Sequence, residues 1–368
     1  MFFPFPIHTK SDVPLLYLKR IRYTELMSGK DFLDAFDNGS DTVPTFLRDM
    51  TLGMDVLGVR TTDVFSDDFN ARLSADSVIA FQRFTGQDAV IGCTHSAAFI
   101  IEQFGGTMKY PEYGIPVPLT HPLDGITDHS LYDIEPKGKL LSAIGSYSLV
   151  KEDIPDVAVV GNVTGPFTKA GVLAGMEYLS MLIVSENDVL YSLLDLCMDS
   201  TERIIEMLAS DGSIDAGLVA AATDNPDLFG LDAYRDISIP YTKRISDMFH
   251  RYGLPVIYHP HGTFANGDVD ILDCTLGSGY DGFHFPENND ISMISESLGK
   301  RTCILGGTDI VPTLHSNDSG RIVSETEHIL DVFRDDRFVF MASCSLHRGI
   351  SLDSIKVMMD TVRSHDDR

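Results

Sequence analysis

The chain has 368 residues, of which 54 are acidic and 28 basic, so its formal net charge is −26. This excess of negative charge repels phosphate backbones and anionic lipid, which excludes nucleic acid and membrane surfaces as main partners. Apolar residues make up 43% of the chain, enough for a substantial core, and no apolar run reaches the roughly 20 residues needed to span a bilayer.

The cysteines and the N-terminal residues indicate the cellular compartment. The five cysteines are scattered along the chain and odd in number, which favours a reducing environment over a disulfide framework. The segment Met1–Pro14 is apolar but short, and prolines interrupt it, so we expect no signal peptide. We therefore expect a cytoplasmic protein.

Short apolar runs alternate with longer amphipathic segments, which is the pattern of repeated β/α units. The predicted strands are Pro44–Met50, Ala89–Cys93, Val157–Val163, Leu218–Thr223, Pro255–His261, Gly279–Phe285, Cys303–Thr308 and Phe338–Cys344. Apolar residues at helical spacing predict helices over Leu190–Leu208, Ala233–Tyr252, Ile322–Phe333 and Ser351–Val362. The segment Gly105–Val150 is rich in proline and glycine, and we expect it to be irregular.

Eight strands alternating with helices predict a (β/α)8 TIM barrel with an elaborated N-terminal region. A doubly wound open sheet is the alternative architecture for the same pattern. No strong linker interrupts the chain, so we expect a single domain over residues 1–368, with residues 1–42 as an N-terminal extension. The sequence is compatible with a homodimer and does not fix the oligomeric state.

Polar residues recur where the predicted strands end. In a barrel of parallel strands the chemistry gathers at the C-terminal ends of the strands, so these residues are candidates for one shared pocket. Strand ends also need turn and cap residues, so each residue taken alone has a structural interpretation as well. The candidates are Asn162, Thr164, Asp224, His259, His261, Asp281, His284, Asp309 and Cys344.

Three of these candidates have the chemistry of metal ligands. His259 and His261 are two residues apart in a predicted strand, so their side chains point to the same side. A thiolate from Cys344, on another strand, would complete a three-ligand zinc site with one open position, the usual form of a catalytic zinc. The other interpretation is that two histidines and one cysteine in a chain of this size are unrelated core or surface residues.

At these residues the chain resembles the uroporphyrinogen decarboxylase superfamily, and within it the corrinoid-linked methyltransferase branch. The resemblance runs from Arg48 to Arg363 and is strongest after Val157. It is carried by the order and spacing of five segments, namely Gly161–Phe167, Pro255–His261, Tyr280–Phe283, Leu305–Asp309 and Ala342–Cys344.

The resemblance implies a zinc-dependent methyltransferase of one-carbon metabolism or methanogenesis. Such an enzyme moves a methyl group between methylcobalamin, carried on a separate corrinoid protein, and a small molecule such as the thiol coenzyme M. The branch places its zinc ligands as His-x-Cys near the fifth strand and Cys near the eighth. His259 and Cys344 match this pattern, and His261 stands where the branch has its first cysteine.

The other candidates then have supporting roles. Asp224, Asp281, His284 and Asp309 are expected to orient the ligands or the substrate in catalysis. Arg48, Asn162 and Thr164 are the expected substrate contacts.

Two alternative functions stay open. The first is a cofactor-free decarboxylase like uroporphyrinogen decarboxylase, whose N-terminal strand carries two arginines as Arg-x-x-x-Arg. This chain keeps Arg48 but has Leu52 at the second position, and its acidic composition does not suit a polycarboxylate substrate. The second is a non-catalytic relative that binds a small ligand or a corrinoid protein.

Overall fold

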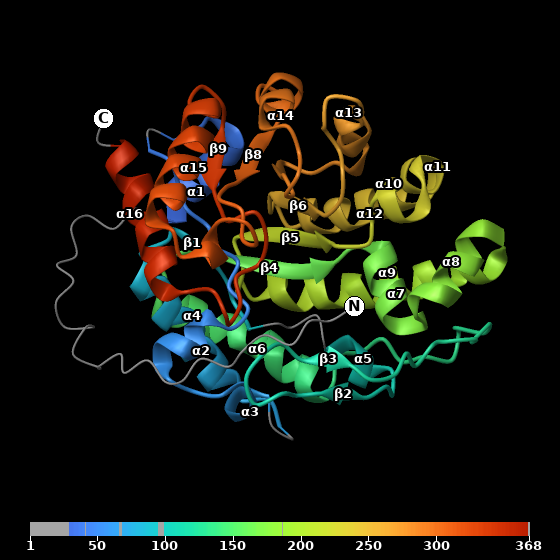
Figure 1. Ribbon diagram of the computed structural model, residues 1–368. Helices are drawn as coiled ribbons and strands as arrows, with labels where there is room; N and C mark the ends of the chain where they lie inside the picture. Colours follow the sequence, from blue (N-terminus) through green and yellow to red (C-terminus); the bar gives the residue numbers. More distant parts are fainter. Residues whose placement is uncertain (1–28, 41, 66–67, 95–98, 186, 367–368) are drawn as a thin grey trace.

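The structure is a computed structural model that describes residues 29–40, 42–65, 68–94, 99–185 and 187–366. Its centre is a curled sheet of seven parallel strands in the order β1-β4-β5-β6-β7-β8-β9 (Figure 1). These strands are β1 (Ala89–Ile91), β4 (Ala158–Thr164), β5 (Ala216–Ala221), β6 (Val256–Pro260), β7 (Gly282–His284), β8 (Cys303–Gly306) and β9 (Phe338–Phe340). Each of these strands overlaps one predicted strand, and only the first predicted strand, Pro44–Met50, has no counterpart among them.

The first predicted strand, Pro44–Met50, forms isolated parallel bridges instead of a regular strand. Phe46 donates its amide to Phe340 of β9 at 2.9 Å, and Thr45 accepts from Ala89 of β1 at 3.3 Å. Farther along, Met50 donates to Leu346 at 2.8 Å. The segment therefore lies between the two edge strands of the curled sheet and hydrogen-bonds to both.

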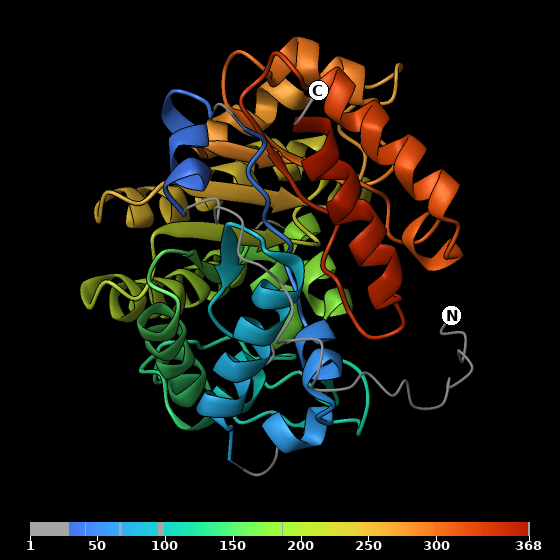
Figure 2. The same ribbon diagram turned by 90° about the vertical axis from the view of Figure 1, so that its left-hand side faces the viewer.

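Helices cover the outside of the sheet (Figures 1 and 2). The longer ones are α4 (Ala71–Thr85), α6 (Gly138–Asp153), α7 (Pro166–Ala174), α8 (Met176–Ser185), α9 (Asp188–Ser210), α12 (Ile239–His250), α14 (Ile291–Leu298), α15 (Ser319–Val332) and α16 (Leu352–Asp366). The short ones are α2 (Leu52–Leu57), α3 (Thr61–Val64), α5 (Phe99–Gln103), α10 (Pro226–Phe229), α11 (Leu231–Ala233) and α13 (Leu272–Thr275). A π-helical turn, Tyr234–Ser238, precedes α12, and 3-10 turns cover Leu276–Ser278 and Leu314–Ser316.

The segment Gly105–Val150 is more ordered than its composition predicts. It contains a small antiparallel hairpin, β2 (Met108–Lys109) with β3 (Val117–Pro118), and most of the 16-residue helix α6. Leu140, Ala143, Ile144, Tyr147 and Val150 form a buried stripe at helical spacing. The prediction of an irregular excursion was wrong for α6, because glycine and serine residues between the stripe positions mask its periodicity.

The predicted N-terminal extension, residues 1–42, is described only from residue 29, apart from residue 41. Here helix α1 (Gly29–Asp37) lies against the N-terminal ends of the strands. Phe32 and Phe36 of α1 are buried, and the amide of Gly29 donates to Asp156 just before β4 at 2.7 Å. Helix α1 therefore belongs to the core, at the end of the sheet opposite the predicted site.

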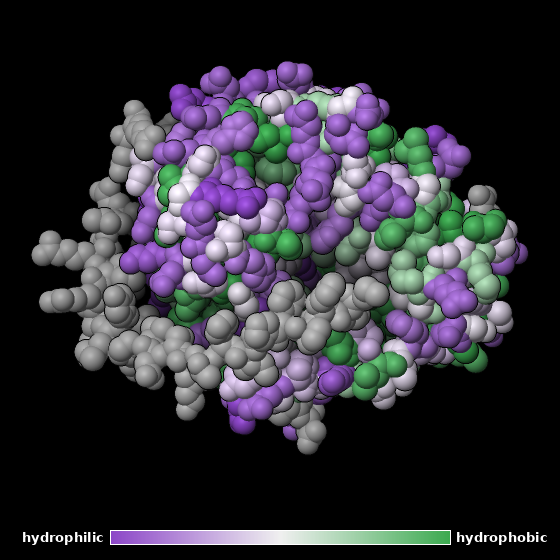
Figure 3. All heavy atoms as spheres, viewed as in Figure 1, coloured by the Kyte–Doolittle hydropathy of each residue, from purple (hydrophilic) through white to green (hydrophobic). Residues whose placement is uncertain are grey.

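Polar residues dominate the face shown in Figure 3, and apolar side chains gather on it over α8 and α10. Exposed members of this group include Met181, Val184 and Leu228. Within the described part of the chain, no helix combines the length and apolar character needed to cross a bilayer. All five cysteines are unpaired.

The buried carboxylate of Asp88 connects the Pro44–Met50 segment to the sheet. We predict that its burial lowers the stability of the fold in a pH-dependent way. It accepts hydrogen bonds from the amide and hydroxyl of Thr45 at 2.7 and 2.9 Å. Burial nevertheless raises the pKa of Asp88 to about 6, above the unfolded value of about 4. The folded protein holds this proton longer than the unfolded chain, so the contribution of Asp88 to stability falls as pH rises between these values.

The Asp88→Asn variant keeps an oxygen for the Thr45 amide and lacks the titrating group. Urea unfolding of both proteins should show that the variant gains stability relative to the wild type as the pH rises from about 4 to about 6. Above this range the difference in unfolding free energy should be constant. Parallel pH profiles would contradict the account.

Candidate metal centre

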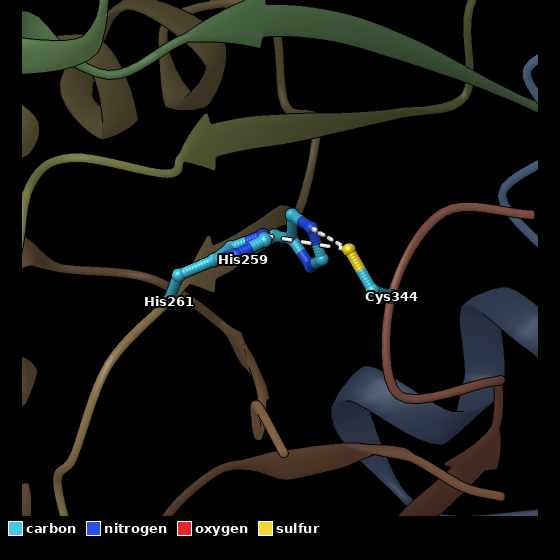
Figure 4. A group of neighbouring side chains, drawn as sticks. All are labelled: His259, His261 and Cys344. Atoms are coloured by element: carbon cyan, nitrogen blue, oxygen red, sulfur yellow. Dashed lines mark hydrogen bonds between the residues drawn. The ribbon is translucent and has the colours of Figure 1, made fainter. Parts of the chain in front are cut away.

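His259, His261 and Cys344 meet at the C-terminal ends of β6 and β9 (Figure 4). One nitrogen of each histidine and the Cys344 sulfur all lie within 4.8 Å of one another. The sulfur is 3.5 Å from Nε2 of His261 and 4.0 Å from Nε2 of His259. The two imidazole planes cross at 89°, so two nitrogens and one sulfur point toward a common centre from different directions.

This donor set fits zinc. A tetrahedral zinc with ordinary ligand bonds separates a nitrogen from a sulfur ligand by about 3.5 Å, close to both sulfur–nitrogen distances here. Borderline-soft zinc accepts mixed imidazole and thiolate ligands. Three protein ligands leave a fourth position for another molecule, which is the arrangement of catalytic zinc sites.

His284 fixes the orientation of His259. The register of β6 and β7 pairs Tyr258 with Phe283, so His259 and His284 follow side by side, with their rings stacked at 4.5 Å. The Nε2 of His284 lies 3.0 Å from the carbonyl of Ala342, which can only accept, so this nitrogen carries the proton. The Nδ1 of His284 is then bare and accepts from Nδ1 of His259.

This chain of hydrogen bonds selects one tautomer of His259. With its proton on Nδ1, His259 presents a bare Nε2 lone pair toward Cys344. Burial lowers the pKa of His284 to about 3 and holds the pKa of His259 well below its ordinary value, and the proximity of Arg48 and of the neighbouring imidazoles adds to the effect. Both imidazoles are therefore neutral, which is the state that binds a metal.

The pKa of the Cys344 thiol is lowered as well. Burial alone raises its pKa, but the hydrogen-bond contact with His261 and the electrostatic influence of His261 and Arg48 outweigh burial and bring the pKa below its ordinary value. Arg48 is held by the Ser345 hydroxyl and by the Asn162 side-chain oxygen, the latter at 3.2 Å. The surroundings of Cys344 thus favour a thiolate, the form that binds zinc.

The three residues lie on the wall of a cavity of about 720 Å³. Arg48 and Thr164 line the same cavity, while Asn162 lines a smaller one of about 30 Å³ behind it. A cavity of this volume accommodates a small organic molecule. Two of the three expected substrate contacts, Arg48 and Thr164, therefore share a cavity with the expected ligands, whereas Asn162 is connected to it through its hydrogen bond to Arg48.

Comparison with known proteins identifies the family. The family model for uroporphyrinogen decarboxylase (URO-D) matches residues 41–365. The chain belongs to this family. The predicted resemblance is thereby confirmed, and the match spans the sheet together with all the candidate site residues.

Two of the proteins to which the chain is similar are methyltransferases. The methylcobamide:CoM methyltransferase MtaA of Methanosarcina barkeri is 20% identical over 229 residues, 62% of this chain and 64% of the relative. The aligned part thus spans less than two thirds of that protein. A solved methyltransferase from Methanosarcina mazei superposes with a TM-score of 0.80 at 19% identity, covering 92% of this chain and 99% of the other. The fold of this chain is therefore similar to that of the solved protein over nearly its whole length.

The four residues expected to assist catalysis do not lie together in the structure. His284 contacts His259 directly. Asp309 follows β8 near Glu287, and burial together with Glu287 and Glu325 raises the pKa of Asp309 to about 6. Asp281 lies at the opposite end of the sheet, where it accepts from the Val256 amide at 2.8 Å. It precedes its strand instead of ending it, so it does not reach the cavity.

Asp224 is fully buried, and its carboxylate accepts hydrogen bonds mainly from the start of helix α7. Its carboxylate accepts from the amides of Phe167 and Thr168 at 2.7 and 2.8 Å, from the Thr168 hydroxyl at 2.6 Å, and from Ser238 at 3.1 Å. A negative charge at this position neutralises the positive end of the helix. The geometry therefore gives Asp224 a structural task beside the cavity.

Three residues around the cavity were missed by the sequence analysis of the site. Glu287 and Ser343 line the cavity and bond to each other at 2.8 Å, and Lys169 lines it from the first turn of α7. Lys169 had a detectable signal, because a lysine four residues into a helix that begins at Gly165-Pro166 opposes the helix dipole.

Replacing Asp224 with alanine is expected to destabilise the fold by roughly 2–4 kcal/mol, because four donors, including two helix-terminal amides, lose their acceptor. Urea unfolding measures this loss, and Asp232→Ala, at an exposed position of α11, serves as the control. If Asp224→Ala keeps wild-type stability but loses activity, the structural assignment is wrong and Asp224 acts in the chemistry.

Proposed function

We propose that this protein is a zinc-dependent methyltransferase that moves a methyl group between a corrinoid protein and a small molecule such as a thiol. The observation that carries the proposal is the convergence of His259, His261 and Cys344 on the wall of the large cavity. The methyltransferase relatives support the same reaction class.

In this proposal each residue has a defined task. His259, His261 and Cys344 hold the ion, and His284 keeps the lone pair of His259 directed at it. A zinc ion held there supplies a Lewis acid that lowers the pKa of a thiol or polarises a methyl donor. Arg48, fixed by Asn162 and Ser345, places a positive charge beside the Cys344 sulfur.

The presence of His261 where the branch has cysteine changes the charge of the centre. One thiolate and two neutral imidazoles leave the divalent ion with a net positive charge, whereas two thiolates would cancel it. A centre of this kind attracts an anionic fourth ligand, such as a thiolate substrate, more strongly. We therefore keep a thiol among the proposed substrates.

The decarboxylase alternative has less support. Leu52, at the position of the second arginine, is buried in α2 and does not line the cavity. Arg48 remains the single arginine on the cavity wall, among the residues that the structure describes. The cofactor-free decarboxylase of this alternative also has no need of a metal-ligand cluster such as His259, His261 and Cys344.

We further propose that the fold is a complete (β/α)8 barrel, with residues 44–50 in the eighth strand position. The hydrogen bonds from this segment to both β9 and β1 support closure. In such a barrel the corrinoid, carried on a separate protein, approaches over the C-terminal ends of the strands, where the cavity and the ligand cluster lie.

Metal content tests the proposal. Elemental analysis of the purified protein should give about one zinc per chain. Zinc should be lost in Cys344→Ser and His261→Ala, because each variant removes one of only three protein ligands. Methyl transfer from methylcobalamin to a thiol, followed by the change in cobalamin absorbance, should be lost in the same variants.

Cys274→Ser is the matched control, since Cys274 is a partly exposed cysteine outside the cluster, and it should retain both zinc and activity. A wild-type protein that takes up no zinc under reducing conditions would disprove the proposed mechanism. Zinc retained in both ligand variants would place the metal elsewhere on the chain.

A further inference from the structure

Lys169 is a buried lysine on the wall of the large cavity. Only 2% of the residue is exposed, and it lines both the large cavity and the small one behind it. Its ammonium group donates to the Thr201 hydroxyl of α9. That hydroxyl in turn donates to the Cys197 carbonyl at 2.8 Å, so it offers Lys169 an uncharged acceptor oxygen and no counter-charge.

The charge of Lys169 is not balanced by the protein. Among the described residues, no carboxylate lies within ion-pairing distance of its ammonium group. Lys151, by contrast, pairs with Asp215 at 2.7 Å although it is more exposed. Burial lowers the pKa of Lys169 to about 8, which shows the cost of charging an amine that has no counter-charge.

Its position in the helix adds to this cost. Lys169 is in the first turn of α7, where the positive end of the helix dipole disfavours a cation. The Asp224 carboxylate offsets the positive end of the α7 dipole, but its oxygens accept hydrogen bonds from amide and hydroxyl donors and form no ion pair with Lys169. A buried cation at a helix N-terminus is locally unfavourable. Natural proteins place such unfavourable residues at functional sites, and Lys169 lies on a cavity wall.

The rest of the wall shows where an anion would lie. Asp227 and Glu287 also line the cavity, but their carboxylates accept from Thr263 and from Ser343 respectively. Lys169 and Thr164 are on the β4–α7 side of the cavity, whereas His261 and Cys344 follow β6 and β9. The unbalanced cation and the ligand cluster therefore occupy separate parts of one wall.

We propose that Lys169 binds an acidic group of the small-molecule substrate, a carboxylate or a sulfonate, at the end away from the reacting atom. The position of the reacting atom rests on the proposed function, but the anion site does not. An anion in the cavity completes the ion pair that the protein leaves open. It also gives a chain with a net charge of −26 a local means of holding a negatively charged molecule that its overall field repels.

Calorimetric binding to the zinc-supplied protein tests this site. The probes are mercaptopropionate, mercaptoethanesulfonate and the uncharged mercaptopropanol, with wild type, Lys169→Met and the control Lys151→Met. Methionine keeps the unbranched shape and lacks the charge. We expect Lys169→Met to weaken binding of at least one acid by about thirtyfold and to leave mercaptopropanol unchanged. Lys151→Met should bind all three like the wild type.

Equal weakening of acid and alcohol, or no change with either, would overturn the proposal and leave Lys169 as a structural partner of Thr201. Thr201→Val separates these roles, because it removes the hydroxyl and keeps the amine. It should retain the preference for acid over alcohol, and loss of that preference would count against an anion site at Lys169.

Propionate binding to metal-free protein separates this inference from the proposed function. If zinc takes no part, mercaptopropionate binds no more tightly than propionate, yet Lys169→Met still weakens the binding of both. If Lys169 takes no part, zinc-dependent thiol binding persists and propionate binding is unaffected by the variant.

Discussion

The site depends on the curl of one parallel sheet. His261 follows β6 and Cys344 follows β9, three strands farther along the sheet order, so their side chains meet only because the sheet bends around on itself. The hydrogen bonds that hold residues 45–50 between β9 and β1 maintain this bend. A flat sheet with the same strand order would separate the sulfur from the imidazoles by several strand spacings of about 4.8 Å each.

Within the curled sheet, the orientation of the His259 imidazole determines whether its bare nitrogen faces the proposed metal position. A backbone carbonyl, that of Ala342, sets the proton position of His284, and His284 sets that of His259. The carbonyl lies just before Cys344 in the chain, so the same loop supplies the sulfur ligand and the origin of the hydrogen-bond chain. Two ligands from distant strands are thus oriented by a single segment after β9.

Much of this arrangement was predictable from the sequence. The short apolar runs located seven strands, and the spacing of His259 and His261 placed two imidazoles on one side of β6. Helix α6 was missed because glycine and serine residues interrupt the pattern around its apolar stripe. Asp281 was misplaced because the sequence does not show whether a residue precedes or ends a strand as short as Gly282–His284. The contact of His284 with His259 depends on strand register, and the unpaired state of Lys169 depends on which carboxylates the fold brings near it. Neither is encoded in local sequence.

The central claim is that a zinc ion lies between two imidazoles and one thiolate, with a position left for substrate. X-ray absorption at the zinc edge tests it most directly, because it reports the kind and number of ligand atoms and not activity. The account predicts one sulfur at about 2.3 Å and nitrogens at about 2.0 Å, with a second sulfur when mercaptopropionate is added. A zinc with no sulfur ligand, or one unchanged by the thiol, would contradict it.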